Sequence, residues 1–356
     1  MNYYRFISKC IIALLSCIIG LSSCGDKIPT NEIHYTTIDN SVLPIKNLFY
    51  FGEGRIVSNS YDPDKNVCIL KLDKDVTEIG KEPFKDCESL TSITIPESVT
   101  EIGDSAFCGC SNLTFITLPE SLTEIGEMVF YNCRLKSISI PPSVTKIGDD
   151  AFSRCSSLTS ISIPPSVTEI GEWAFSRCSN LTSISIPPSV TKIGDGAFSR
   201  CSSLTSIIVS KDNKVYDSRE DCNAIIHTES NTLIRGCENT IIPESVTKIR
   251  GAAFSGCSSL TSITIPPSVT EIGGSAFCDC SSLTSISIPP SVTEIGWNAF
   301  YGCSSLTSIT IPPSVTEIGL FTFCGCSRLT EVRIPKGCNV DKFAGLIRPH
   351  VEIIRY

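Results

Sequence analysis

Large apolar side chains recur along most of this chain with a period of 23 residues. Phenylalanines recur with that period, apart from one step of 22 residues and an interruption after residue 198. This column comprises Phe84, Phe107, Phe130, Phe152, Phe175, Phe198, Phe254, Phe277, Phe300 and Phe323. A column of cysteines follows three residues behind and comprises Cys87, Cys110, Cys133, Cys155, Cys178, Cys201, Cys257, Cys280, Cys303 and Cys326. Ten copies of one pattern predict a structure of repeated units.

One unit shows the elements that each copy predicts. Ile161 and Ile163 alternate with serines, which indicates a strand with one buried face. The Pro-Pro pair that follows lacks amide hydrogens and ends the strand. A second extended segment is expected at residues 167–170, and Gly171 permits a turn. We expect a short helical turn after it, with residues 174, 175 and 178 on its buried side.

A single unit would leave these apolar side chains in water, so neighbouring units must stack into a repeat solenoid. The predicted fold is a β-rich curved rod with short helical turns, in which ten repeats occupy residues 72–338. Residues 45–71 are expected to form an N-terminal cap and residues 339–356 a C-terminal cap that ends in a strand. Ten residues more than two periods separate Cys201 from Cys257, and we interpret residues 209–242 as a β-hairpin in place of one regular repeat.

The Leu-x-x-Ile-x-Ile core, the Pro-Pro-Ser-Val that follows and the Ala-Phe-x-x-Cys ending resemble the BspA-like, or Treponema pallidum-type, leucine-rich-repeat family. The resemblance covers residues 72 to about 338. It implies a right-handed leucine-rich-repeat rod and a bacterial cell-surface protein. Several members of that family are adhesins for host matrix or for other bacteria.

The N-terminus has the organisation of a targeting segment. Arg5 and Lys9 precede an apolar run at residues 10–21, too short to span a bilayer. Leu21-Ser-Ser-Cys24 resembles the lipobox of bacterial lipoproteins, which implies cleavage after residue 23 and lipid on Cys24. Residues 24–44 would then be a tether, and the protein would lie at the surface of the cell envelope, in the outer membrane, held by lipid alone. The alternative is an ordinary signal peptide with an incidental cysteine.

Charge and motifs exclude several classes of function. The formal net charge is −8, and no basic stripe runs the length of the chain, so nucleic acid is not an expected partner. The three histidines, His34, His227 and His350, lie outside the regular repeats, so no histidine-based triad can be assembled from repeat positions. No phosphate-binding loop or hydrolase motif occurs. We predict neither enzymatic activity nor a cofactor.

The cysteines admit two interpretations. Cys108, Cys278 and Cys324 each precede a column cysteine by two residues, but zinc requires four convergent ligands, so we favour packing in the core over a metal site. Cys222 and Cys237 are equidistant from the centre of the expected hairpin. A symmetric hairpin would place them opposite each other, so we predict a disulfide there, with two buried thiols as the alternative.

Candidate contact residues lie mainly at the turn after each Ile-Gly step. The outward strand positions are nearly all Ser or Thr, whereas the turn varies and carries Trp173, Trp297, Tyr301, Phe321 and Tyr131. Aromatic and Arg side chains dominate binding hot spots, so we expect partner contacts on this edge and on the hairpin. One position on three consecutive repeats is arginine: Arg154, Arg177 and Arg200. They could form a cationic stripe suited to an anionic polymer such as a sulfated glycan. Each arginine also follows an acid by four or five residues, at Asp150, Glu172 or Asp195, and we favour local pairing with these acids over the stripe.

These features favour a monomeric binding or adhesion protein for a host or microbial protein or glycan. Near-identity of the three arginine repeats favours an alternative, a structural spacer rod without a ligand. A third class, an enzyme or a glycan-capture subunit, lacks support from a nucleophile–base pair or from an array of aromatic platforms.

Overall fold

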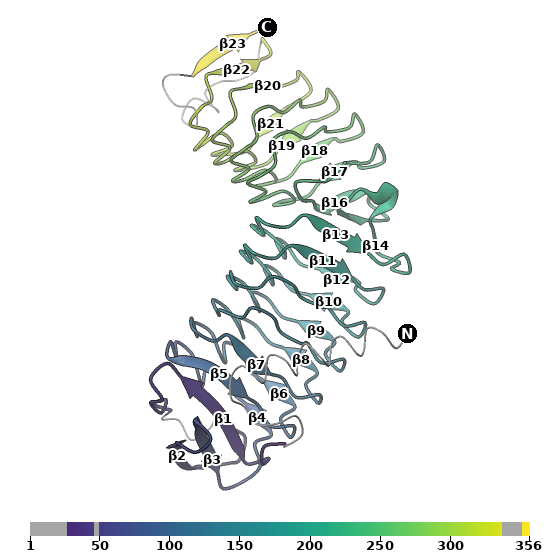
Figure 1. The fold of residues 1–356 in the computed structure, drawn as a ribbon. Helices are drawn as coiled ribbons and strands as arrows, with labels where there is room; N and C mark the ends of the chain where they lie inside the picture. The colour runs from purple at the N-terminus through teal and green to yellow at the C-terminus, as the bar shows by residue number, and fades with distance from the viewer. Residues whose placement is uncertain (1–26, 46–49, 337–350) are drawn as a thin grey trace.

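The computed structural model describes residues 27–45, 50–336 and 351–356, and the chain winds into a solenoid that bends into an arc (Figure 1). The predicted signal peptide, Cys24 and His350 lie outside the described residues. Among the described residues, no helix has the length and apolar character needed to cross a membrane.

Two ladders of short parallel strands connect the repeats. The Ser-Ile-Ser-Ile positions form the first ladder, with strands β5 (Leu90–Thr94), β7 (Phe115–Thr117), β11 (Ser183–Ile186), β13 (Ser206–Val209), β20 (Ser308–Thr310) and β22 (Glu331–Ile334). Single bridges at Ser139–Ser162 and Thr264–Ser287 continue it. The second ladder joins two-residue strands, namely β4 (Glu78–Ile79), β6 (Glu101–Ile102), β8 (Glu124–Ile125), β9 (Lys146–Ile147), β10 (Glu169–Ile170), β12 (Lys192–Ile193), β17 (Lys248–Ile249), β18 (Glu271–Ile272), β19 (Glu294–Ile295) and β21 (Glu317–Ile318). The predicted solenoid and its strands are confirmed.

The predicted helical turns are wrong. Within the described residues the only helix is a 3-10 turn, η1 (Arg219–Asp221). In the segment after each Ile-Gly step, bonds within the repeat alternate with bonds to the next one. Ser153 donates its amide hydrogen to the carbonyl of Asp150 at 3.0 Å, whereas Phe152 donates to Ala174 of the following repeat at 2.7 Å. Left-handed residues in each copy, such as Asp150 with φ 51°, prevent a helix and turn alternate amides toward the neighbour.

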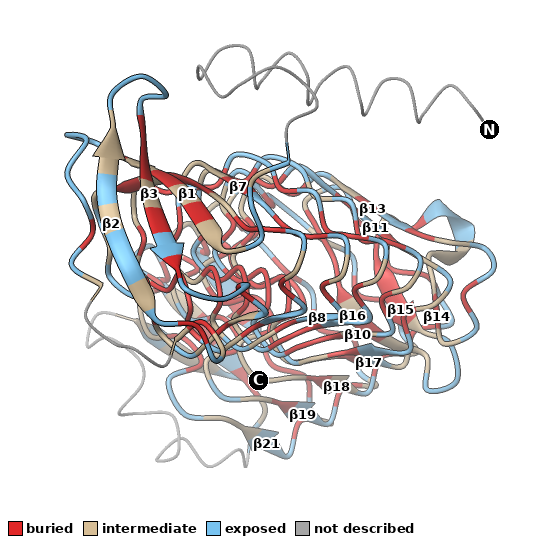
Figure 2. Ribbon diagram, turned by 90° about the horizontal axis from the view of Figure 1, so that it is seen from below, coloured by how far each residue is buried: buried red, intermediate tan, exposed pale blue. Residues whose placement is uncertain are grey.

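The core contains two stacks of phenylalanine rings inside the coil, one on each side of the irregular repeat. Neighbouring rings from Phe84 to Phe198 lie 5.2–5.7 Å apart between centroids, and those from Phe254 to Phe323 lie 5.1–6.0 Å apart. Phe51 of the cap extends the first run. Figure 2 shows buried positions on the inside of the coil and exposed positions on its outside.

The cysteine column serves both packing and hydrogen bonding. In eight repeats the thiol lies 3.0–3.2 Å from the carbonyl oxygen of the phenylalanine one repeat earlier, as in the bond from Cys178 to Phe152. That carbonyl also accepts the amide hydrogen of Cys155 in its own repeat. The thiol therefore occupies the second acceptor site of a buried carbonyl, which an alanine cannot do.

The N-terminal cap is an antiparallel sheet that includes residues expected to be a tether. Strand β1 (Glu32–Thr37) lies between β3 (Val67–Leu72) and β5, and β2 (Ile56–Asp62) pairs with β3. Ile33 and Tyr35 are buried in the core. The tether predicted for residues 24–44 is therefore wrong at residues 32–37, because β1 supplies the hydrogen-bond partner of the exposed edge of β5. At the other end, β23 (Glu352–Arg355) pairs with β22 as the last strand.

The irregular repeat is a three-stranded insertion on one side of the solenoid only. Strands β14 (Tyr216–Asp217), β15 (Ile225–His227) and β16 (Thr232–Arg235) are antiparallel to one another, and β16 continues in parallel into β17. On the turn side nothing intervenes, since Arg200 donates its amide hydrogen directly to Ser255 at 2.8 Å. The insertion is thus a wedge that opens the strand side and bends the rod toward the turn side. The labelled strands β14 and β16 lie on the outer side of the arc (Figure 1).

The disulfide predicted between Cys222 and Cys237 is absent, and both are free, buried thiols. His227–Thr232 and Ile226–Leu233 keep the symmetric register, but a bulge then pairs Ile225 with Arg235. The one-residue shift takes the two cysteines out of opposition. They pack instead into different cores, Cys237 with the N-terminal repeats and Cys222 with the C-terminal repeats.

We expect Cys178→Ala to lower the free energy of unfolding by about 1–2 kcal/mol, since it removes a buried hydrogen bond and the volume of the sulfur atom. Urea unfolding followed by circular dichroism measures the change. Asn180→Ala, at an exposed position of the same repeat, is the control and should stay within about 0.5 kcal/mol of the parent. Equal stability of the two variants would show that the thiol bond contributes nothing.

A candidate binding groove on the inner edge

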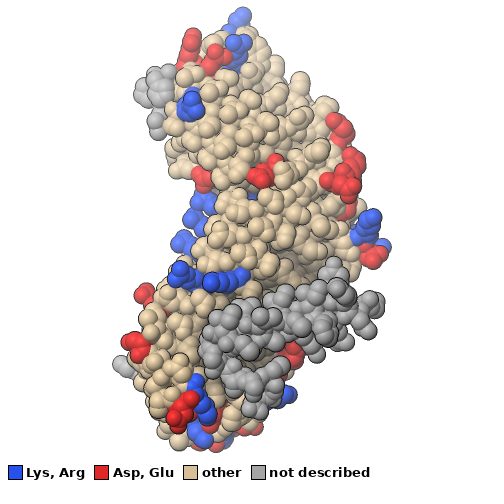
Figure 3. All heavy atoms as spheres, viewed as in Figure 1, with Lys and Arg blue, Asp and Glu red and all other residues tan. Residues whose placement is uncertain are grey.

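A single groove of about 640 Å³ collects every side chain predicted to contact a partner. These are Tyr131, Arg154, Trp173, Arg177, Arg200, Trp297, Tyr301 and Phe321. They come from repeats on both sides of the wedge, so the bend brings two stretches of the solenoid toward a common space. Figure 3 shows basic side chains gathered along the hollow inner edge of the arc, near its middle.

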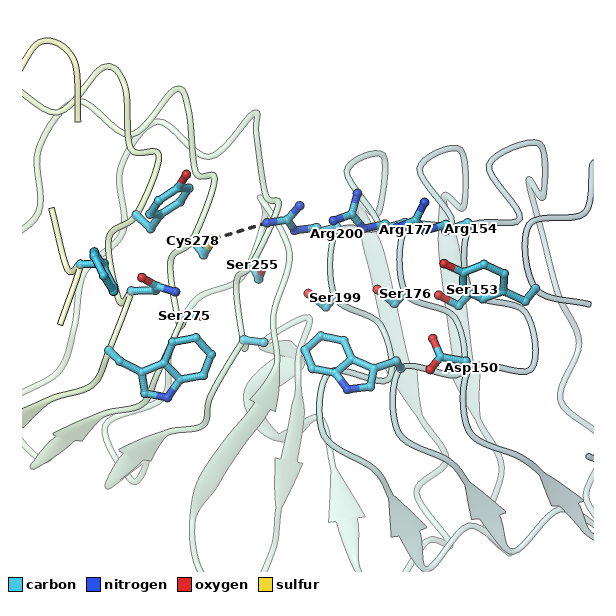
Figure 4. A pocket seen from close by; sticks show the side chains of 17 residues that line it. Asp150, Ser153, Arg154, Ser176, Arg177, Ser199, Arg200, Ser255, Ser275 and Cys278 are labelled. Atoms are coloured by element: carbon cyan, nitrogen blue, oxygen red, sulfur yellow. Dashed lines mark hydrogen bonds between the residues drawn. The ribbon is translucent and has the colours of Figure 1, made fainter. Parts of the chain in front are cut away.

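A row of hydroxyl groups forms the floor of the groove. Ser153, Ser176, Ser199 and Ser255 follow the core phenylalanine in successive turns and are at most 5% exposed. Figure 4 shows them side by side below the three arginines. Sequence reasoning missed this row, because a serine next to Phe and Arg resembles any solvent-facing serine of the repeat.

The three arginines form a continuous cationic row along one rim (Figure 4). Arg154 lies over the ring of Tyr131, 5.5 Å from its centroid. Arg200 pairs with Asp279 across the wedge at 2.6 Å and approaches the sulfur of Cys278 at 3.7 Å. Within the described chain no ion pair forms at Arg154 or Arg177.

The local ion pairs favoured from the sequence do not form in the described chain. Asp195 pairs with Arg250 rather than with Arg200, and the amide of Glu172 is bonded to Asp149. Asp195 and Glu172 do not line the groove, whereas Asp150 and all three arginines do. The charge of the arginines is thus directed into the hollow.

The arginine row is held in a strained backbone conformation. Arg154, Arg177 and Arg200 have φ of 59–63°, in the left-handed region. The other repeats fill this position with Gly, Asn or Asp, namely Asp86, Gly109, Asn132, Gly256, Asp279, Gly302 and Gly325. Those residue types tolerate the conformation, whereas other L-residues are destabilised by about 1–2 kcal/mol. Strain of this kind concentrates at functional sites.

Aromatic side chains line the groove and remain open to solvent. Trp173 is 40% exposed, Trp297 61%, Phe321 53% and Tyr301 38%. The indole of Trp173 lies on Gly196 of the next repeat, and that of Trp297 lies on Gly274 of the preceding one; neither glycine has room for a Cβ beneath the ring. The two glycines let the indoles lie close against the backbone at the groove.

Among the described residues, Asp150 is the one acid that lines the groove. Burial raises the pKa of its carboxyl above the ordinary value, while a hydrogen bond with Ser153 and the charge of Arg154 act in the opposite direction. The raised pKa means that mild acid makes the groove more cationic.

The described residues hold no cluster of three or more His, Cys, Asp or Glu side chains able to bind a metal ion. Burial raises the pKa of Cys155 and of Cys201 to about 12, so these thiols stay protonated at neutral pH and donate hydrogen bonds. Metal binding requires the thiolate. The geometry of the cysteine column thus supports a role in packing the solenoid core.

Comparison with known proteins places these features in a family. The model of the BspA type leucine rich repeat region matches residues 55–158, 123–222 and 230–344, most of the chain. A leucine rich cell surface protein from Faecalibacterium prausnitzii is 28% identical, with 94% of this chain and 95% of that chain covered at a TM-score of 0.67. The pneumococcal vaccine antigen PcpA is 25% identical over 88% of this chain and 82% of that one, with a TM-score of 0.67.

A third solved structure, a leucine-rich repeat protein from Eubacterium ventriosum, is 26% identical over 80% of this chain and 79% of that one, with a TM-score of 0.60. No curated protein matches the sequence.

We expect Arg177→Gly to be more stable than Arg177→Ala by about 1 kcal/mol, because both lose the side chain but only glycine relieves the left-handed strain. The free energies of unfolding in urea measure the difference. If the two variants unfold at the same urea concentration, the backbone at residue 177 is not strained and the arginine row does not destabilise the fold.

Proposed function

This chain belongs to the BspA-type leucine-rich-repeat family, and on that premise we propose that it is a binding module of the bacterial cell surface whose ligand lies in the inner groove. The ligand is a host or microbial protein or glycan. The observation that carries this proposal is the convergence of the exposed aromatic side chains and the arginine row on one concave surface.

A spacer rod accounts less well for the same features. A rod that only separates two points needs neither a bend nor exposed tryptophans, and it gains nothing from arginines held at φ near 60°. The strand face, mostly Ser and Thr, resembles what a spacer would present. The groove, with its arginines and exposed aromatic side chains, does not resemble the surface of a spacer.

We propose further that the protein is not an enzyme. In the described chain His34 is bonded to Glu32 and His227 to Ser230, at 2.9 Å in each case. The second pair resembles a nucleophile and base, but Ser230 also donates its amide hydrogen to the same ring nitrogen, as in a local turn. Neither residue lines the groove.

Location at the cell surface is supported by the Faecalibacterium prausnitzii relative, which is described as a cell surface protein. For this chain we propose attachment through lipid on Cys24, with the solenoid exposed from the outer membrane. The sequence motif at residues 21–24 carries that part of the proposal.

Binding through the groove predicts that Trp297→Ala loses at least about tenfold in affinity for whichever ligand a screen of matrix proteins, mucin glycans and polysaccharides identifies, since an exposed tryptophan in a pocket is a typical hot spot. Biolayer interferometry measures the affinities. Ile208→Ala, on the strand face and 59% exposed, is the matched control and should bind like the parent. Failure to bind any member of the screen would favour the spacer.

Lipid anchoring predicts that Cys24→Ser abolishes the incorporation of an alkyne-labelled fatty acid when the chain is expressed in a Gram-negative host, and moves the protein from the membrane to the soluble fraction. Cys17→Ser, within the apolar run, should label like the parent. Equal membrane retention of Cys24→Ser would identify an ordinary signal peptide.

A further inference from the structure

The groove presents two parallel rows that run along the axis of the solenoid, and two indoles beside them. The arginines form a rim, the serines form the floor, and the indoles of Trp173 and Trp297 lie in the same groove, one on each side of the wedge. The arginine row and the serine row each advance by one residue per repeat, whereas the two indoles lie several repeats apart. Successive guanidinium groups and successive hydroxyl groups are therefore spaced like neighbouring strands, about 4.8 Å apart.

The guanidinium groups of the arginine rim can bind negatively charged groups of a ligand. Arg154 and Arg177 form no ion pair within the described chain, and Arg200 is bound to Asp279 by one edge of its guanidinium. A guanidinium binds sulfate and carboxylate groups through two parallel hydrogen bonds. This cationic row stands out on a chain with a net charge of −8, which disfavours non-specific binding to anions elsewhere.

The floor and the indoles suit a ring-shaped, hydroxyl-bearing ligand. Aromatic faces pack against the C–H face of a sugar, and a row of small hydroxyls contacts sugar hydroxyls without steric conflict. The carboxylate that lines the described groove is Asp150, whose pKa is raised by burial, and the nearby Asp279 is already paired with Arg200.

We propose that the groove binds a linear anionic polysaccharide, with one sugar per repeat, its sulfate or carboxylate groups on Arg154, Arg177 and Arg200, and its rings against Trp173 and Trp297. This inference rests on the proposed function and specifies the class of ligand.

The period of the rows distinguishes a polysaccharide from an acidic peptide. An extended peptide advances about 3.3 Å per residue and places side chains on one face about 6.6 Å apart, which is out of step with a repeat of about 4.8 Å. A pyranose ring in a linear chain advances by nearly the length of one repeat. Only the polysaccharide keeps successive charges in register with successive arginines.

The test uses the purified chain and four probes: heparin oligosaccharides for sulfate, oligogalacturonate for carboxylate, dextran as a neutral polysaccharide and polyglutamate as an acidic peptide. We expect calorimetry to show binding of one or both anionic glycans and none of dextran or polyglutamate. The binding should weaken as salt rises from about 50 mM to about 200 mM.

The double variant Arg154→Ala/Arg177→Ala should lose at least about tenfold in affinity and flatten the salt dependence. Arg55→Ala/Arg328→Ala removes the same charge from exposed positions outside the groove and should bind like the parent. Trp297→Ala should weaken binding while leaving the salt dependence unchanged, because it removes no charge.

Three outcomes would overturn the inference: polyglutamate binding as tightly as the glycans, equal losses in the two double variants, or no binding of either anionic glycan. If the screen described above still finds a ligand sensitive to Trp297→Ala, the groove is a binding site for another class of ligand and the proposed function stands. If that screen also finds nothing, the proposed function fails with it.

Discussion

Every repeat of this solenoid depends on hydrogen bonds and ring contacts with the repeat on either side. Phe152 donates its amide hydrogen to Ala174, Cys178 donates its thiol to the carbonyl of Phe152, and the rings of Phe152 and Phe175 lie 5.3 Å apart. These contacts fix the distance between repeats. Because that distance is fixed, any side chain that recurs once per repeat becomes a straight row, and both the core and the groove are made of such rows.

The same constraint explains what the sequence could and could not predict. The period of Phe and Cys specifies a stack, and alternating Ile and Ser specify its strands, so the solenoid was predictable. The helical turn was not, because Trp173 and Arg177 fit a helix and only the bonds to the next repeat impose their left-handed conformation. The disulfide failed for a related reason, since the bulge at Ile225 has no sequence signal that a symmetric count reveals. Strand β1 was missed because its polar flanks resemble a linker.

For the groove, the sequence identified the side chains but not their convergence. Variation at the turn marked the aromatic residues, and a threefold repeat marked the arginines. Their common space depends on the wedge, which adds strands on one side while Arg200 stays bonded to Ser255 on the other. Arg235 is buried at this junction, where its guanidinium donates to the carbonyl of Ser255 at 3.0 Å and helps to keep the turn side closed. The bend is thus a tertiary property of an irregular repeat.

The arginine row ends on both sides, but the fold does not fix how many arginine repeats it contains. Repeats ending at Cys155, Cys178 and Cys201 differ at few positions, and each joins its neighbours through the same contacts. Duplication or loss of one such unit in the gene would leave every interface intact and change the row by one guanidinium. Unequal recombination therefore changes the number of arginines on the rim one at a time, without a new fold and without a change at either cap.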